Sequence, residues 1–184
     1  RLSRANCRVN ERNLSRLSDA IRDVPDFPKP GIVFKDITPL LRSPGALQYA
    51  GEAMAAPFRD QDITAVAAIE SRGFIFGAAV AHILGVGFVP IRKPGKLPFK
   101  TRRNEYTLEY GSGILEIHDD ALTADDRVLI VDDVLATGGT ASGASALIRD
   151  FGAAIAGAAM LIELAFLDGR KCLPGLQVHS LITY

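Results

Sequence analysis

A strand, a turn and a helix are encoded in succession at residues 128–140, which run Val128-Leu129-Ile130-Val131-Asp132-Asp133-Val134-Leu135-Ala136-Thr137-Gly138-Gly139-Thr140. The aliphatic run at the start predicts a buried parallel strand. The small residues from Ala136 to Thr140 then offer backbone N–H groups, two hydroxyls and two glycines where the next helix begins. Because glycines let a backbone approach its ligand and a helix N-terminus favours an anion, this turn is typical of a phosphate cradle. It has neither the Gly-Lys-Ser/Thr of the nucleotide P-loop nor the G-x-G-x-x-G spacing.

The acidic pair that precedes the turn limits which ligands can bind there. At about 4 Å and an effective dielectric near 20, each contact between a carboxylate and a bound phosphate costs about 4 kcal/mol. Asp132 and Asp133 must therefore face hydroxyl groups, a cation, or both. Vicinal ribose hydroxyls are donors that carboxylates accept well, so the stretch predicts a sugar phosphate, with its phosphate on the turn and its diol on the aspartates. The alternative is an acidic pair in an ordinary turn.

Strand and helix patterns alternate on both sides of this stretch. We expect strands at 63–69, 86–91, 127–132, 154–164 and 178–183, the first and third of them buried, helices at 13–24, 44–59, 73–84 and 140–151, and a hairpin of strands at 105–109 and 113–117. Ser43-Pro44 supplies a capping hydroxyl and a first-turn proline for the second helix. The alternation predicts an α/β fold with a doubly wound, mostly parallel sheet flanked by helices. Ligands on such sheets bind at the carboxyl ends of the strands.

A basic segment at 92–104 is expected to be a long loop, because it is polar and aperiodic. It contains Arg92, Lys93, Lys96, Lys100, Arg102 and Arg103, with no acid before Glu105. A loop of this length in a compact domain usually covers or binds a ligand. This one suits a polyphosphate with its Mg²⁺, over which it would close. The alternative is a solvated basic loop.

Three further segments suggest contacts with the same ligand. Glu70-Ser71-Arg72-Gly73 ends a predicted strand, where Arg72 would offer a forked donor to phosphate oxygens. Phe34 lies in extended sequence at 30–37 and could stack on a flat base, although a lone aromatic is more often part of the core. Glu109 follows the basic loop and could manage the proton of an incoming nucleophile, although most glutamates simply face solvent.

Composition excludes several classes of protein. The 184 residues form one predicted domain, 1–184, and the 21 basic and 21 acidic residues balance, which argues against a broadly basic nucleic-acid binder. No apolar stretch reaches the ~20 residues that a membrane span needs. Cys7 and Cys172 have no disulfide-scaffold or metal spacing, which favours a reducing compartment. The histidines are single and unclustered. The Arg-rich start fits an exposed helix face or a cloning remnant, with a transit peptide as the alternative.

Together these segments resemble the type I phosphoribosyltransferases, and most closely the adenine-using members of that family. Residues 128–140 look like the family's phosphoribosyl pyrophosphate signature, and the segments 27–37, 70–74, 91–98 and 108–111 match in order, so that the resemblance covers about 27–184. It implies a parallel sheet with an N-terminal helical extension and hood (1–26) and a flexible lid (92–110). It also implies a cytoplasmic homodimer that converts adenine and phosphoribosyl pyrophosphate to AMP and pyrophosphate with Mg²⁺ carried by the substrate.

The resemblance also implies a role for each matched residue. Ala136, Thr137, Gly138, Gly139 and Thr140 would bind the 5′-phosphate, and Asp132 and Asp133 the ribose. Ser71, Arg72, Arg92, Lys93 and Lys96 would bind pyrophosphate. Phe34 would stack on adenine while the backbone of Val33 and Lys35 reads its edge, and Glu109 would act as the catalytic residue on the ring nitrogen's proton. Lys35 stands where the resemblance leads us to expect an arginine. This difference leaves recognition of adenine unaffected only if the backbone alone contacts the edge of the base.

Three rival functions stay open at this point. A sibling transferase would use another base, such as hypoxanthine or xanthine. A regulator would sense phosphoribosyl pyrophosphate without catalysis, although the chain shows neither an added DNA-binding segment nor a basic surface. A receiver-type signalling domain also ends a strand with an acidic pair, but the Thr-Gly-Gly-Thr turn and the basic loop do not fit it.

Overall fold

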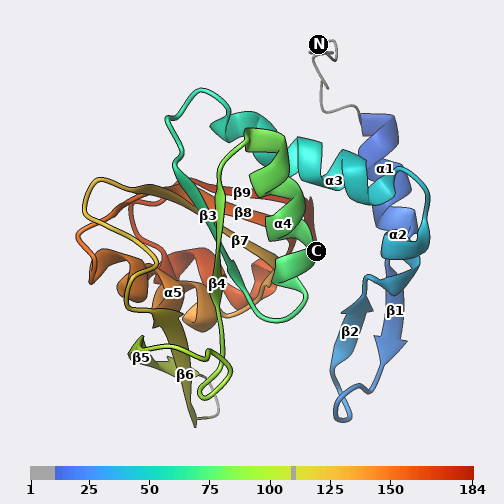
Figure 1. Cartoon of the computed structure of the whole chain (residues 1–184). Helices are drawn as coiled ribbons and strands as arrows, with labels where there is room; N and C mark the ends of the chain where they lie inside the picture. The colour runs from blue at the N-terminus through green and yellow to red at the C-terminus, as the bar shows by residue number, and fades with distance from the viewer. Residues whose placement is uncertain (1–10, 109–110) are drawn as a thin grey trace.

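The computed structural model describes residues 11–108 and 111–184, which form a parallel five-stranded sheet with helices on both faces (Figure 1). The strand order is β4-β3-β7-β8-β9, from β3 (Ala65–Ile69), β4 (Gly87–Ile91), β7 (Arg127–Leu135), β8 (Ala154–Glu163) and β9 (Val178–Thr183). Every neighbouring pair in this sheet is parallel. The predicted fold class is therefore confirmed.

The strands of this sheet come from the continuous apolar stretches of the sequence. Such stretches suit the sheet because helices cover both of its faces. One face packs against α5 (Gly139–Arg149) and a separate hairpin, with Ile130 and Leu147 in the shared core. The other face packs against α3 (Ala46–Ala55) and α4 (Gly73–Leu84), with Val131 and Phe76 in a second core. A strand buried on both faces loses the polar alternation of a half-exposed strand, which is why the sequence runs were continuous.

The N-terminal part departs from the prediction. The helix α1 (Glu11–Asp19) ends early, and β1 (Arg22–Pro25) pairs antiparallel with β2 (Val33–Asp36), where a continuous helix over 13–24 was expected. A further helix, α2 (Thr38–Arg42), was missed. Ser43 consequently closes α2 through its backbone N–H and does not start the next helix, which begins at Ala46. Residues 1–10, which carry most of the Arg-rich start and Cys7, lie outside the described part.

The basic segment is shorter as a loop than predicted. The strand β5 (Thr101–Leu108) begins within it and pairs antiparallel with β6 (Gly111–His118). Arg102 stacks 3.9 Å from the Phe151 ring centroid and donates to Asp119 at 2.7 Å. These contacts tie a basic side chain to the body of the protein, so that the loop prediction for 101–104 is wrong.

Three short 3₁₀ helices complete the described elements. They are η1 (Ala56–Phe58), η2 (Ala165–Leu167) and η3 (Gly169–Cys172). The last two follow β8, and η3 contacts the turn that precedes α5. Among the described helices, none combines the length and apolar character needed to cross a membrane.

Candidate active site

The predicted phosphate turn lies between the carboxyl end of β7 and the first turn of α5. Gly138 is the N-cap residue of α5 and has φ +83°, a left-handed conformation that glycine adopts without strain. No described side chain caps this helix N-terminus. Its first N–H groups therefore remain available to an anion, as a phosphate site requires.

The two aspartates face a cleft beside this turn. The Oδ1 atom of Asp132 accepts the backbone N–H of Asp133 at 2.8 Å, and Asp133 pairs with the Arg72 guanidinium at 2.7 Å between Oδ2 and Nε. Burial, and then the neighbouring charge of Asp133, raise the pKa of Asp132 well above its ordinary value. Burial also raises the pKa of Asp133, while Arg72 opposes the rise. The pair is thus short of compensating donors, which ribose hydroxyls would supply.

Gly73 lets the N-terminus of α4 approach the acidic pair. A Cβ atom at this position would lie 2.6 Å from Oδ1 of Asp132, well inside van der Waals contact. The absence of a side chain at Gly73 therefore makes room for Asp132.

Arg72 connects the acidic pair to the predicted base site. Its guanidinium carbon lies 4.8 Å from the centroid of the Phe34 ring while its Nε atom contacts Asp133. The β1–β2 hairpin is thereby joined to the carboxyl end of β3. Arg72 is a planar cation between an aromatic face and a carboxylate, a position from which it can turn toward a phosphate.

The loop after β4 is held at its base by two carboxylates. Arg92 donates to Glu70 at 2.7 Å and to the Lys96 carbonyl at 3.0 Å. The buried Glu116 accepts the Gly95 N–H at 3.0 Å. This network gives the start of the loop a defined shape. The guanidinium of Arg92 is engaged with protein groups, and Lys93 is the loop cation that borders the cleft.

The predicted base site is formed by β2. Phe34 meets Phe27 edge-on, with 5.2 Å between ring centroids. The Lys35 ammonium turns to Asp23 on β1, 2.7 Å away, and lies 3.7 Å from the centroid of the Tyr184 ring. The side chain that departs from the expected arginine is therefore occupied by Asp23 and Tyr184, and the backbone of β2 is left to face a base.

A cleft of about 780 Å³ brings most of these groups together. The predicted site residues that line it are Val33, Phe34, Lys35, Ser71, Arg72, Lys93, Asp132, Asp133, Ala136 and Thr140. In Figure 1 the hairpins β1–β2 and β5–β6 stand on opposite sides of the end of the sheet where these residues lie. Arg92, Lys96 and residues 137–139 are not among the lining residues, and Glu109 lies outside the described residues.

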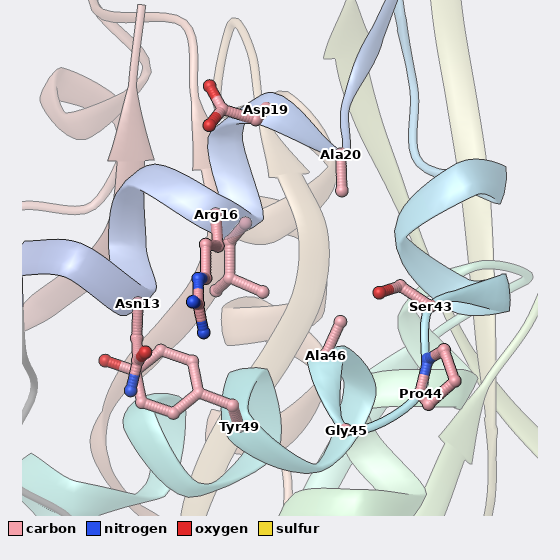
Figure 2. Close-up of a pocket in the computed structure, with 10 residues that line it drawn as sticks. Asn13, Arg16, Asp19, Ala20, Ser43, Pro44, Gly45, Ala46 and Tyr49 are labelled. Carbon is pink, nitrogen blue, oxygen red and sulfur yellow. The ribbon is translucent and has the colours of Figure 1, made fainter.

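A second cavity, of about 570 Å³, lies between α1 and the start of α3 (Figure 2). Asn13 and Arg16 line it from α1, Ser43 and Pro44 from the connection between α2 and α3, and Tyr49 from α3. It shares no lining residue with the cleft and contains none of the predicted site residues. The chemistry is accordingly assigned to the cleft.

Comparison with known proteins identifies the architecture. Residues 36–172 match the phosphoribosyl transferase domain family. The adenine phosphoribosyltransferase of Methylococcus capsulatus is 57% identical over 171 residues, which is 93% of this chain and all of that protein. The chain belongs to the adenine phosphoribosyltransferase family. The resemblance drawn from the sequence motifs is confirmed.

Solved structures of adenine phosphoribosyltransferases have the same fold. The enzyme of Rhodothermus marinus superposes with a TM-score of 0.91 at 53% identity, covering 95% of this chain and all of that one. The enzyme of Saccharomyces cerevisiae, in complex with D-2,5-dideoxy-2,5-imino-altritol 1,6-bisphosphate and adenine, gives 0.87 at 40% identity, with 92% and 98% covered. The receiver-type alternative is thereby removed.

The cleft also contains residues that the motifs did not indicate. Leu164 lines it directly after β8, and the rule that ligands bind at carboxyl ends of strands could have indicated it. Tyr106 lines it from β5. A Cβ at Gly113 would lie 2.5 Å from the Tyr106 ring, and one at Gly143 would lie 2.8 Å from it. The ring thus packs in a slot between β6 and α5, and no sequence pattern predicts such a slot.

Proposed function

We propose that this chain transfers the phosphoribosyl group of 5-phosphoribosyl 1-pyrophosphate to adenine, giving AMP and pyrophosphate. The observation that carries the proposal is a cleft, in a member of this family, that is bordered by an uncapped phosphate turn, a carboxylate pair and an aromatic strand. These features lie in the order in which phosphate, ribose and base follow one another in AMP.

We infer the role of each group from its place in the cleft. Residues 136–140 hold the 5′-phosphate through backbone N–H groups, and Asp132 and Asp133 accept hydrogen bonds from the ribose hydroxyls. Ser71, Arg72 and Lys93 contact pyrophosphate. Arg92 supports that contact through Glu70 and the backbone of the basic loop, and Lys96 reaches pyrophosphate when the loop closes. These roles rest on placement and on the chemistry of each group.

The reaction is a displacement at the anomeric carbon. The bond from that carbon to the pyrophosphate oxygen breaks, a bond to an adenine ring nitrogen forms, and the nitrogen's proton leaves. Such carbons pass through oxocarbenium-like states, so electrostatic stabilisation dominates catalysis. Glu109 is proposed to take the proton. The basic loop and the β5–β6 hairpin exclude water, which would otherwise hydrolyse the donor.

Magnesium is proposed to enter with the substrate. In the described residues, no cluster of three or more His, Cys, Asp or Glu side chains could hold a metal ion. A cleft with two carboxylates and a polyphosphate nevertheless matches the way Mg²⁺ usually binds, through substrate phosphates and one or two carboxylates. When bound it would neutralise the leaving pyrophosphate, and Asp132 and Asp133 are the carboxylates that would face it.

A cytoplasmic location and a homodimer belong to the same proposal. The two cysteines have no spacing that requires an oxidising compartment. Apolar side chains are exposed at one side of the described sheet, where β4 is the edge strand: Phe88 is 38% exposed and Ile75, on α4, is 36% exposed. Exposed apolar side chains at a sheet edge favour association with a second copy.

The proposed reaction is tested by turnover with a panel of bases. Labelled adenine, hypoxanthine, guanine and xanthine are each supplied with phosphoribosyl pyrophosphate and Mg²⁺, and pyrophosphate release is measured. Adenine alone should give efficient turnover. Faster reaction of a 6-oxopurine would assign the chain to a sibling activity, and binding of the donor without turnover of any base would favour a sensor.

The base contacts give a first prediction. Phe34→Ala should raise KM for adenine more than Lys35→Ala does, because Phe34 offers its ring to the base whereas the Lys35 ammonium is engaged by Asp23. Loss of an aromatic stacking partner costs about 1–3 kcal/mol, or roughly 5- to 150-fold in KM. Steady-state kinetics with adenine as the varied substrate measure both. The reverse order would show that the lysine side chain reads the base.

The raised pKa of Asp132 gives a second prediction, a gain in stability with a loss of activity. The folded-state pKa lies above that of the unfolded chain, so the ionised carboxylate destabilises the native state at neutral pH, and this effect disappears as pH falls through the folded-state pKa. Asp132→Asn should therefore raise Tm by roughly 2–4 °C at neutral pH, about 1 kcal/mol for a chain of this size. The difference should shrink at acid pH.

The same variant should bind the donor less well. A hydrogen bond to a charged acceptor contributes about 1.5–3 kcal/mol, so kcat/KM for the donor should fall about 10- to 100-fold. Asp133→Asn provides the comparison, since it also removes the partner of Arg72 and should not share the gain in Tm. Wild-type rates in both variants would contradict the assignment of the pair to ribose.

A further inference from the structure

The short helix η3 lies directly against the phosphate turn. A Cβ at Gly138 would lie 2.2 Å from the Gly169 carbonyl oxygen, and a Cβ at Gly169 would lie 2.2 Å from the carbonyl oxygen of Ala136. The Cys172 thiol donates to the Thr137 carbonyl at 3.3 Å. Three consecutive residues of the turn are therefore in contact with η3, so that the position of η3 limits where the turn can lie.

One side chain fastens η3 to the sheet. Arg170 donates from Nε to Oε1 of Glu163 and from Nη2 to Oε2, each at 2.6 Å, and from Nη1 to the Val178 carbonyl at 2.9 Å. Glu163 is the last residue of β8, and Val178 is the first of β9. All three nitrogens of the fork are used, in a geometry that lysine cannot reproduce.

The partner carboxylate is well placed to hold a single orientation. The side chain of Glu163 is only 7% exposed, and hydrogen bonds from Arg170 lower the pKa of this carboxyl below its ordinary value. It is therefore ionised at neutral pH. Neither Glu163 nor Arg170 lines the cleft, whereas the next residue, Leu164, does. The ion pair is therefore next to the cleft but does not contact a ligand bound in it.

We propose that Glu163 and Arg170 are positioning residues for the phosphate turn, which they support by holding η3 against its back. The inference rests on the proposed function and deepens it, since it assigns 5′-phosphate affinity to a pair outside the cleft. The N–H groups of the turn bind phosphate well only when they are held in one arrangement, because a displaced donor loses both distance and angle. Freeing η3 should loosen the part of the site that holds the 5′-phosphate and leave the pyrophosphate contacts at Ser71 and Arg72 intact.

The test compares two product inhibitors, of which only AMP carries the 5′-phosphate that the turn is proposed to bind. Inhibition constants for AMP and for pyrophosphate are measured for wild type, Arg170→Ala, Arg170→Lys and Glu163→Gln. Lys171→Ala is the matched control. It removes a neighbouring cation of η3 whose ammonium pairs only with the exposed Asp168 among the contacts described.

Arg170→Ala should raise the inhibition constant of AMP roughly tenfold and leave that of pyrophosphate unchanged. Glu163→Gln should behave alike, since its amide N–H₂ would face the guanidinium. Arg170→Lys should give a smaller rise, and Lys171→Ala none. The lysine and glutamine variants keep the test open if the alanine variant folds poorly.

A parallel rise of both constants, or none in any Arg170 or Glu163 variant, would overturn the inference, since the pair would then serve general stability or nothing measurable. The proposed function is judged separately, on the wild-type protein. If wild type makes no AMP from adenine and does not bind AMP in calorimetry, the function fails and the inference falls with it. If wild type is active and the variants match it, only the inference fails.

Discussion

Glu109→Gln is expected to lower kcat by roughly 10²- to 10⁴-fold, the contribution typical of a positioned general acid or base. The proposal places this carboxylate at the proton that adenine loses as the new bond forms. Glu109 follows directly on β5, and Tyr106 of β5 borders the cleft, as do Gly113 and Ile114 of β6. Glutamine keeps the size of the side chain and loses its basicity, so KM for the donor should change little.

The matched control for this prediction is Glu105→Gln. Glu105 is an exposed residue of β5 and pairs in register with Ile114. It should retain wild-type kcat. Single-turnover measurements separate chemistry from product release. A loss of tenfold or less in Glu109→Gln would reduce its role to positioning.

Gly138→Ala is expected to damage the phosphate turn severely, although it adds a single methyl group. The new Cβ would lie 2.2 Å from the Gly169 carbonyl oxygen, and φ of +83° is unfavourable for any residue with a Cβ. Either the turn or η3 must move. A misplacement of about 1 Å can cost on the order of 10²-fold in rate, so kcat/KM for the donor should fall by about that factor.

Gly85→Ala separates the two causes of this loss. Gly85 has φ +72° at the end of α4, and a Cβ there would meet nothing within 4 Å. Both variants should lose about 1–2 kcal/mol of stability through the left-handed conformation. Only Gly138→Ala should lose affinity for AMP, measured by calorimetry. Equal AMP affinity in the two variants would remove the turn from the site.

The parts of the fold that could be predicted are those with a strong local pattern. The continuous apolar runs of β3, β7 and β8 indicate strands that are buried on both faces. The helix α4, Gly73–Leu84, has the predicted bounds. The small hood could not be predicted in this way. The β1–β2 pairing is supported by ion pairs such as Arg22–Asp36, between residues whose periodicity alone indicates neither partner.

Charge also misled the prediction where its partner is distant in sequence. Arg102 and Arg103 are predicted to lie in the basic loop, yet they contact Phe151 and Glu116, respectively, and belong to a strand. Arg92 likewise meets Glu70, 22 residues earlier. Tertiary ion pairs of this kind determine whether a basic segment forms a loop or a strand, and whether a basic side chain contacts the ligand or supports the protein. They cannot be predicted from a single sequence.

The grouping of the candidate site residues around one cleft was more predictable than the surrounding structure, because the central ones are neighbours in the sequence. Asp132, Asp133 and the turn after them are contiguous, and one strand and one helix place them together. Residues that act through long-range contacts were not indicated by any motif. Tyr106 in its glycine slot and Arg170 behind the turn are the two clearest cases.

The central claim is that the turn from Ala136 to Thr140 holds the 5′-phosphate while Asp132 and Asp133 hold the ribose diol. A crystal structure with AMP tests it most directly. The account predicts the phosphate within hydrogen-bond distance of the N–H groups of the turn, the two ribose hydroxyls on the aspartates, and adenine against Phe34. An empty turn with AMP bound elsewhere, for instance in the cavity between α1 and α3, would contradict it.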